Sequence, residues 1–177
     1  MFVKKITVRQ TVLGAVFLAF GLVFPFFTAQ IPQIGSMLLP MHLPVLICGF
    51  VCGGPVGAVV GFITPLLRSV LFGMPPMFQA ITMAFELCAY GLVSGLLYST
   101  LRKTKVSVFI SLIGAMAIGR VVWGCVRFVQ TMAAGTEFTF AIFMASAFGS
   151  AAPGIILQLI VVPSVVFLLE RSGYLKN

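Results

Sequence analysis

Charged residues are scarce in this chain of 177 residues. Only 8% of the residues are charged, whereas a soluble domain carries about 25%. There is no Asp, a single His and only three Glu. The lack of Asp excludes Asp-based metal motifs and the aspartyl phosphate of a pump. No G-x-x-x-x-G-K-[ST] run is present either, so the chain does not hydrolyse ATP through a P-loop.

Cysteine is also too sparse to indicate a metal site. The four cysteines, all in apolar runs, are Cys48, Cys52, Cys88 and Cys125. Cys48 and Cys52 would share one face of a helix, but no further Cys or nearby His completes a zinc shell. We therefore expect buried, inert thiols, with no metal and no cofactor.

Apolar residues dominate what remains. They make up 60% of the chain, and the mean hydropathy is +1.18. Gly- and Pro-rich breakers divide these residues into runs close to the ~20 residues that a membrane-spanning helix needs. The sequence predicts an all-α membrane protein with one integral membrane domain, residues 1–177. Six transmembrane helices are expected at about 11–27, 42–51, 56–72, 78–101, 106–132 and 149–169.

The basic residues predict the orientation. The loops expected outside, 28–41, 73–77 and 133–148, contain no Lys or Arg. Eight basic residues lie in the segments expected inside: Lys4, Lys5, Arg9, Arg102, Lys103, Lys105, Arg171 and Lys176. Cytoplasmic segments of membrane proteins carry such an excess, so both termini are expected to be cytoplasmic. We interpret the net charge of +8 as a topology signal rather than as a nucleic-acid footprint.

Four charged residues fall inside the expected spans: Arg68, Glu86, Arg120 and Arg127. An Arg at mid-bilayer costs about 2.5–3.5 kcal/mol on insertion scales, so such residues usually face a cavity or a partner. One alternative is that an Arg pairs with Glu86 and only ties helices together. Glu86 cannot serve all three arginines, and reaching out from a helix end would explain Arg68 alone.

The sequence therefore predicts a cavity with surplus positive charge, suited to a small organic anion. Arg120 and Arg127 are seven residues apart and share a helix face. His42 is either a helix-end residue at the interface or part of the lining of the site. The candidate substrate-binding residues are His42, Arg68, Glu86, Tyr90, Arg120, Trp123, Arg127, Gln130 and Gln158.

Several segments resemble a known family. Ala15-Val-Phe-Leu-Ala19 is similar to a motif of small residues, and MHLPVLICGFVCGGPVG (41–57) and PLLRSVLFGMPPMFQAITMAFELCAYGLVSGLLY (65–98) are more distinctive. Together with six short spans they resemble the substrate-binding S components of energy-coupling factor (ECF) vitamin transporters, with the pantothenate type favoured.

That resemblance implies a substrate-capture subunit rather than an enzyme. It implies binding of a small water-soluble vitamin or precursor from the outer side, in the plasma membrane of a bacterium. The implied partners are a membrane-embedded coupling subunit, which Ala15 and Ala19 would contact, and two ATPase subunits that hydrolyse ATP. Pyridoxine, riboflavin, folate and queuosine precursors remain open beside pantothenate.

Two alternatives belong to other functional classes. The chain could be a standalone secondary transporter or channel for a small organic anion. An intramembrane serine protease would need Ser94 or Ser150 to face His42 within the bilayer.

Overall fold

A computed structural model describes residues 6–28, 39–101, 104–135, 139 and 151–175, and in these ranges all regular structure is helical. The elements are α1 (Val8–Val23), the 3-10 helix η1 (Phe24–Thr28), α3 (His42–Cys52), α4 (Gly54–Phe72), α5 (Met77–Thr100), α6 (Lys105–Ala133) and α8 (Ala152–Arg171). The expected start of the last helix, at 149, lies outside the described residues.

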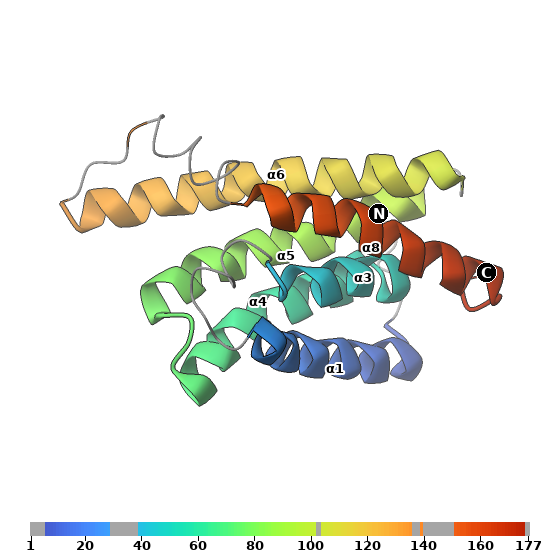
Figure 1. Cartoon of the computed structure of the whole chain (residues 1–177), viewed down its shortest axis with the longest axis horizontal. Helices are drawn as coiled ribbons and strands as arrows, with labels where there is room; N and C mark the ends of the chain where they lie inside the picture. The colour runs from blue at the N-terminus through green and yellow to red at the C-terminus, as the bar shows by residue number, and fades with distance from the viewer. Residues whose placement is uncertain (1–5, 29–38, 102–103, 136–138, 140–150, 176–177) are drawn as a thin grey trace.

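Five of the described helices are long and apolar enough to cross a membrane, and α3 is a shorter apolar helix. The prediction of an all-α membrane protein with six helices is confirmed. Figure 1 shows the long helices lying side by side along a common direction, with the start of α1 and the end of α8 at the same end of the bundle. That the cytoplasm lies at this end stays a prediction.

Local capping explains where two helices begin. The side chain of Thr7 accepts a hydrogen bond from the backbone N–H of Gln10, whose own side chain bonds back to Thr7. Thr104 and Ser107 form the same reciprocal pair before α6. Such capping boxes satisfy backbone donors that a helix start leaves unpaired. The helices therefore begin at Val8 and Lys105, slightly ahead of the apolar runs that follow.

The short helix α3 lies at the centre of the bundle. Its 11 residues rise only ~16 Å, about half the thickness of a bilayer core. It packs against α1, α4, α5 and α8, and nearly all of its residues are buried. Because protein rather than lipid surrounds α3, it does not need the length of a spanning helix. Its first residue, His42, is consequently only 1% exposed.

Glycines bring the backbones of α4 and α5 into direct contact. A Cβ atom on Gly57 would lie 2.7 Å from the carbonyl oxygen of Gly91, and a Cβ atom on Gly91 would overlap the carbonyl of Gly57. The same restriction holds where Gly61 meets the carbonyl of Leu87. Small residues permit such close approach in membranes, where van der Waals packing drives much of helix association. This contact holds α5, which carries Glu86 and Tyr90, against α4.

We predict that Gly91→Ala lowers the melting temperature of the protein in mild detergent. The added methyl group meets backbone atoms that cannot move aside, and overpacking typically costs about 1–3 kcal/mol. Gly114→Ala is the matched control, because its Cβ would meet only Cδ1 of Leu97, at 2.8 Å, and that side chain can rotate. Equal melting temperatures for the two variants would contradict the proposed close contact.

Candidate functional site

A buried ion pair joins α5 to α6 inside the bundle. The Nη1 atom of Arg120 lies 3.0 Å from the Oε1 atom of Glu86. Glu86 is 1% exposed and Arg120 is 6% exposed. Both residues lie within helices long enough to span the membrane. One intramembrane arginine thus pairs with the acid, as one sequence alternative anticipated.

His42 and Tyr90 surround this pair. The Nε2 atom of His42 is 3.6 Å from the Oε2 atom of Glu86, on the side of the carboxylate away from its Oε1 contact with Arg120. The rings of His42 and Tyr90 meet edge to face, with centroids 5.4 Å apart. Tyr90 is fully buried, and its ring fits against α6 because residue 119 is glycine: a Cβ atom there would overlap the ring. This role of Gly119 was not predicted from the sequence.

Gln158 adds a fully buried amide from α8. This helix packs against α3 and α6, and its neighbouring residues Leu157 and Leu159 pack on the apolar cluster that contains Tyr90. His42, Glu86, Tyr90 and Arg120 are linked by these contacts, and we call them, together with the buried Gln158 of the adjacent helix α8, the polar cluster.

The polar cluster has more hydrogen-bonding capacity than the described part of the chain uses. Buried atoms of the cluster without a hydrogen-bond partner there are Nδ1 and Nε2 of His42, the hydroxyl of Tyr90, Nε and Nη2 of Arg120, and both amide atoms of Gln158, while Oε1 of Glu86 has only its ion-pair contact with Arg120. Most buried polar groups in proteins are hydrogen-bonded, and each exception needs an explanation. An unsatisfied group costs about 1–3 kcal/mol, so these atoms, which come from four packed helices, are candidates for contact with a polar ligand or with water.

The free atoms of Arg120 have a particular geometry. Its Nη1 atom faces Glu86, which leaves Nε and Nη2 unpartnered within the described residues. Two neighbouring donors on one guanidinium can bind both oxygens of a carboxylate. In the same ranges, no three His, Cys, Asp or Glu residues lie together as a metal site.

The other two intramembrane arginines make different contacts. Arg68 is 2% exposed and donates a hydrogen bond to the carbonyl oxygen of Leu22. Its guanidinium also lies 4.8 Å from the ring centroid of Phe26 and 5.3 Å from that of Phe72. Arg68 therefore ties the end of α4 to the end of α1 and to η1.

Arg127 and Gln130 hold together the ends of α5 and α6. The guanidinium of Arg127 lies 5.0 Å from the ring centroid of Phe78. Gln130 donates to the carbonyl oxygen of Phe78 at 3.0 Å and accepts from the hydroxyl of Thr82, a partner that sequence reasoning did not identify. Trp123 is half-buried on the same helix.

These contacts change the expected charge of the site. The polar cluster contains one guanidinium and one carboxylate, while Arg68 and Arg127 contact aromatic rings elsewhere. With a neutral His42, the formal charges of the cluster cancel. The surplus of positive charge that residue counting suggested is therefore not found among these five residues.

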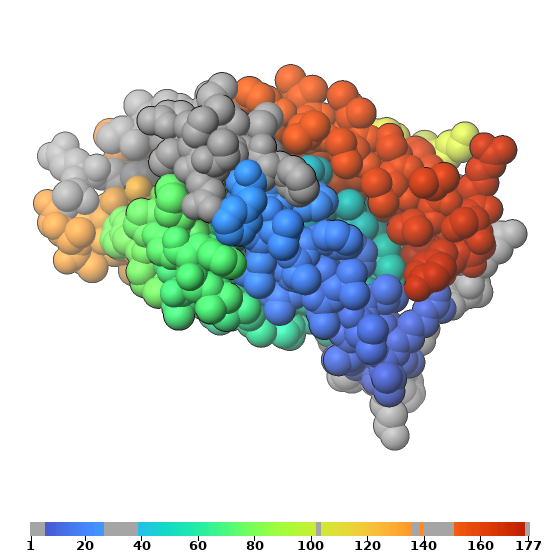
Figure 2. All heavy atoms as spheres, turned by 60° about the horizontal axis from the view of Figure 1, so that its bottom comes forward, coloured from blue at the N-terminus to red at the C-terminus, as the bar shows by residue number. Residues whose placement is uncertain are grey.

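A second feature lies on the outside of the bundle. Figure 2 shows α1 on the surface of the molecule, and Ala15 and Ala19 are exposed there. Gly14 and Gly21 instead face α4, where their Cβ atoms would lie 2.7 Å from Val56 and 2.6 Å from Thr64.

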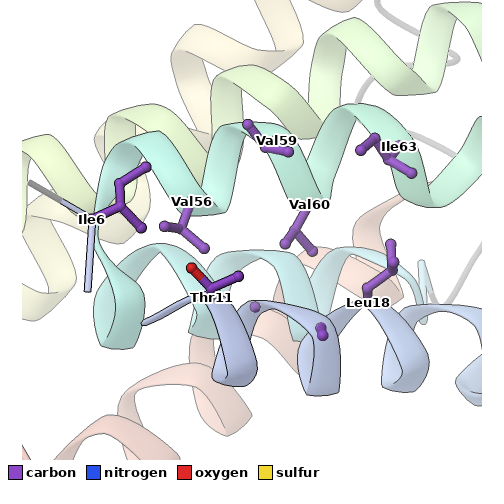
Figure 3. A pocket seen from close by; sticks show the side chains of 9 residues that line it. Ile6, Thr11, Leu18, Val56, Val59, Val60 and Ile63 are labelled. Atoms are coloured by element: carbon purple, nitrogen blue, oxygen red, sulfur yellow. The ribbon is translucent and has the colours of Figure 1, made fainter. Parts of the chain in front are cut away.

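An apolar groove of about 250 Å³ runs between α1 and α4 (Figure 3). Its lining residues are Ile6, Thr11, Gly14, Ala15, Leu18, Val56, Val59, Val60 and Ile63. Ala15 thus borders the groove from α1.

Comparison with known proteins gives one match. No curated protein and no solved structure matches the chain. The family model described as "ECF transporter, substrate-specific component" matches residues 9–166, which is most of the chain. The chain belongs to the family of ECF transporter substrate-specific components.

Proposed function

We propose that this protein is the substrate-capture subunit of an ATP-driven ECF importer and that it binds a small water-soluble vitamin or precursor, with pantothenate favoured. Membership of the substrate-specific component family supports the role in transport. The ligand would enter from the outer side, as the predicted orientation requires. The protein would then act without catalytic residues of its own.

The observation that carries this proposal is the set of buried polar atoms that have no hydrogen-bond partner among the residues the structure describes. They come from α3, α5, α6 and α8, and they include both donors and acceptors. A ligand that satisfies them gains hydrogen bonds that are costly to leave unmade. The Nε and Nη2 atoms of Arg120 would bind the carboxylate of pantothenate. His42 and the amide of Gln158 would bind its hydroxyl and amide groups.

The remaining predicted substrate-binding residues would lie outside the polar cluster. Arg127, Trp123 and Gln130 would line the approach along α6 toward the polar cluster. Arg68 would hold α4 against α1 and η1, and would act on the ligand only through that arrangement.

The partners in this proposal are a membrane-embedded coupling subunit and two ATPase subunits. The exposed Ala15 and Ala19 provide a flat, apolar strip on α1, and small residues allow a partner helix to approach closely. The groove beside Ala15 would receive larger side chains of that partner.

We predict that the protein purified in mild detergent retains one vitamin-like molecule, which native mass spectrometry would detect. A thermal-shift screen of water-soluble vitamins should then show stabilisation by that compound, because a ligand that binds only the folded state raises the melting temperature. Uptake of the compound into vesicles should require the ATPase partners. Uptake by the isolated protein would instead favour a standalone secondary transporter or channel.

We predict that Arg120→Ala weakens binding of the retained vitamin at least tenfold. Loss of a hydrogen bond to a charged group costs about 1.5–3 kcal/mol, and about 1.4 kcal/mol corresponds to tenfold. Arg171→Ala is the control, since it removes the same charge from an exposed position at the end of α8. Isothermal titration of both variants checks this. Unchanged affinity in Arg120→Ala would refute the assignment of the site.

Ala15→Trp and Ala19→Trp should abolish transport while leaving vitamin binding intact. A bulky ring on this strip would keep the coupling subunit from approaching α1. Ile160→Trp is the matched control, because Ile160 is a 62% exposed apolar residue on α8. Transport by the complete complex in vesicles, together with binding to the isolated protein, measures both effects. Loss of binding in the alanine variants would show that α1 shapes the ligand site instead.

A further inference from the structure

The polar cluster poses a problem of charge for any anionic ligand. Arg120 already faces Glu86 at 3.0 Å, and both are buried. A carboxylate bound to the free Nε and Nη2 atoms of Arg120 would place two negative charges around one guanidinium. Unpaired charge in the membrane interior is costly, so a second positive charge must enter with the anion.

His42 is placed to carry that charge. Its Nε2 atom lies 3.6 Å from the Oε2 atom of Glu86, whereas Arg120 approaches through Oε1. Neither ring nitrogen of His42 has a hydrogen-bond partner within the described residues, so a second proton on the ring would displace no existing donor there. Histidine is the side chain whose charge ordinarily changes between pH 5 and 8.

We propose that a carboxylate substrate binds together with one proton, which is taken from solvent and held on the imidazole of His42. This inference rests on the proposed function, because it assumes a carboxylate ligand. In the bound state the imidazolium of His42 and the guanidinium of Arg120 balance the carboxylates of Glu86 and of the ligand, so the net charge stays zero. The proton leaves a hydronium ion or a buffer acid and forms an N–H bond on the imidazole, and no other covalent bond is formed or broken.

Among the described residues, no other ionisable group near His42 can gain a positive charge. From α5, Tyr90 and Glu86 face the imidazole; Glu86 could only lose its negative charge, and the His42→Gln variant below tests that alternative. From α6, Arg120 is already matched by Glu86, and α8 contributes the uncharged amide of Gln158.

The charged residues on the remaining neighbours of α3 are engaged elsewhere. Arg9 of α1 lies over the ring of Tyr174, and Arg68 of α4 lies against Phe26 and Phe72. Glu170, at the far end of α8, accepts a hydrogen bond from Tyr98.

The sign of the pH dependence follows directly. The protonated site binds the anion better, so affinity is highest at low pH and falls as pH rises. Uptake of one proton per ligand corresponds to a change of up to about tenfold per pH unit. A carboxylic acid with an ordinary pKa near 4 remains ionised above pH 6, so the ligand itself does not titrate in this range.

The test compares pantothenate with its alcohol analogue, in which a CH2OH group replaces the carboxylate. Isothermal titration at pH 6 and pH 8 should show pantothenate binding at least tenfold weaker at pH 8, and the alcohol changing less than twofold. Titration near pH 7 in buffers of different ionisation enthalpy should show close to one proton taken up with pantothenate and none with the alcohol.

Two variants identify the proton acceptor. His42→Gln should bind pantothenate with less than a twofold difference between pH 6 and pH 8 and take up no proton; its binding of the alcohol shows that it is folded. Glu86→Gln leaves Arg120 with a free charge. It should bind pantothenate at pH 8 at least as tightly as the unchanged protein does at pH 6, again without proton uptake.

The outcomes separate this inference from the proposed function. Tight binding of pantothenate with no pH dependence and no proton uptake would overturn the inference and leave the capture role intact. Proton uptake that persists in His42→Gln would overturn the assignment to His42. Failure of both probes to bind at either pH would refute the pantothenate proposal and the inference that rests on it.

Discussion

The contact between Glu86 and Arg120 is the interaction on which the interior of this protein depends. Either residue alone would be an unpaired charge in the membrane, and breaking a buried pair typically costs about 3–5 kcal/mol. Because the partners come from α5 and α6, the pair fixes how these two helices face each other. His42 then contacts Glu86, whose position the pair has set, and Tyr90 packs against His42.

Backbone packing makes this polar interior possible. Glycines at the α4–α5 contact bring these helices close together, and the central α3 can then be half the length of a spanning helix. A short central helix starts inside the bundle rather than at its surface, so His42 becomes a buried residue beside Glu86. Gly119 has a comparable effect on a smaller scale, because it leaves room for the ring of Tyr90. The positions of His42, Glu86 and Tyr90 therefore depend on glycines that allow neighbouring backbones and rings to approach closely.

Much of the fold could be predicted from the sequence, since Gly- and Pro-rich breakers such as CGGP separate apolar runs of membrane-spanning length. The charged residues inside the spans could also be recognised from the sequence. Their partners could not be predicted, because each contact depends on the rotation of its helix and on residues far away in the sequence. Arg68, for example, donates a hydrogen bond to Leu22, 46 positions away. Residue counting assigned three arginines to one cavity; in the structure Arg120 pairs with Glu86, Arg68 contacts Leu22, Phe26 and Phe72, and Arg127 contacts Phe78. The burial of His42 was also left open, since the sequence does not show that α3 begins inside the bundle.

We expect that a ligand completes the hydrogen bonds of the polar cluster. The most direct measurement is an experimental structure of the protein with its retained ligand. We expect an acidic group of the ligand within hydrogen-bond distance of Nε and Nη2 of Arg120, and a polar group of the ligand at the amide of Gln158. A ligand bound elsewhere, for example beside Arg68 or in the groove between α1 and α4, with the polar cluster unchanged, would contradict the claim.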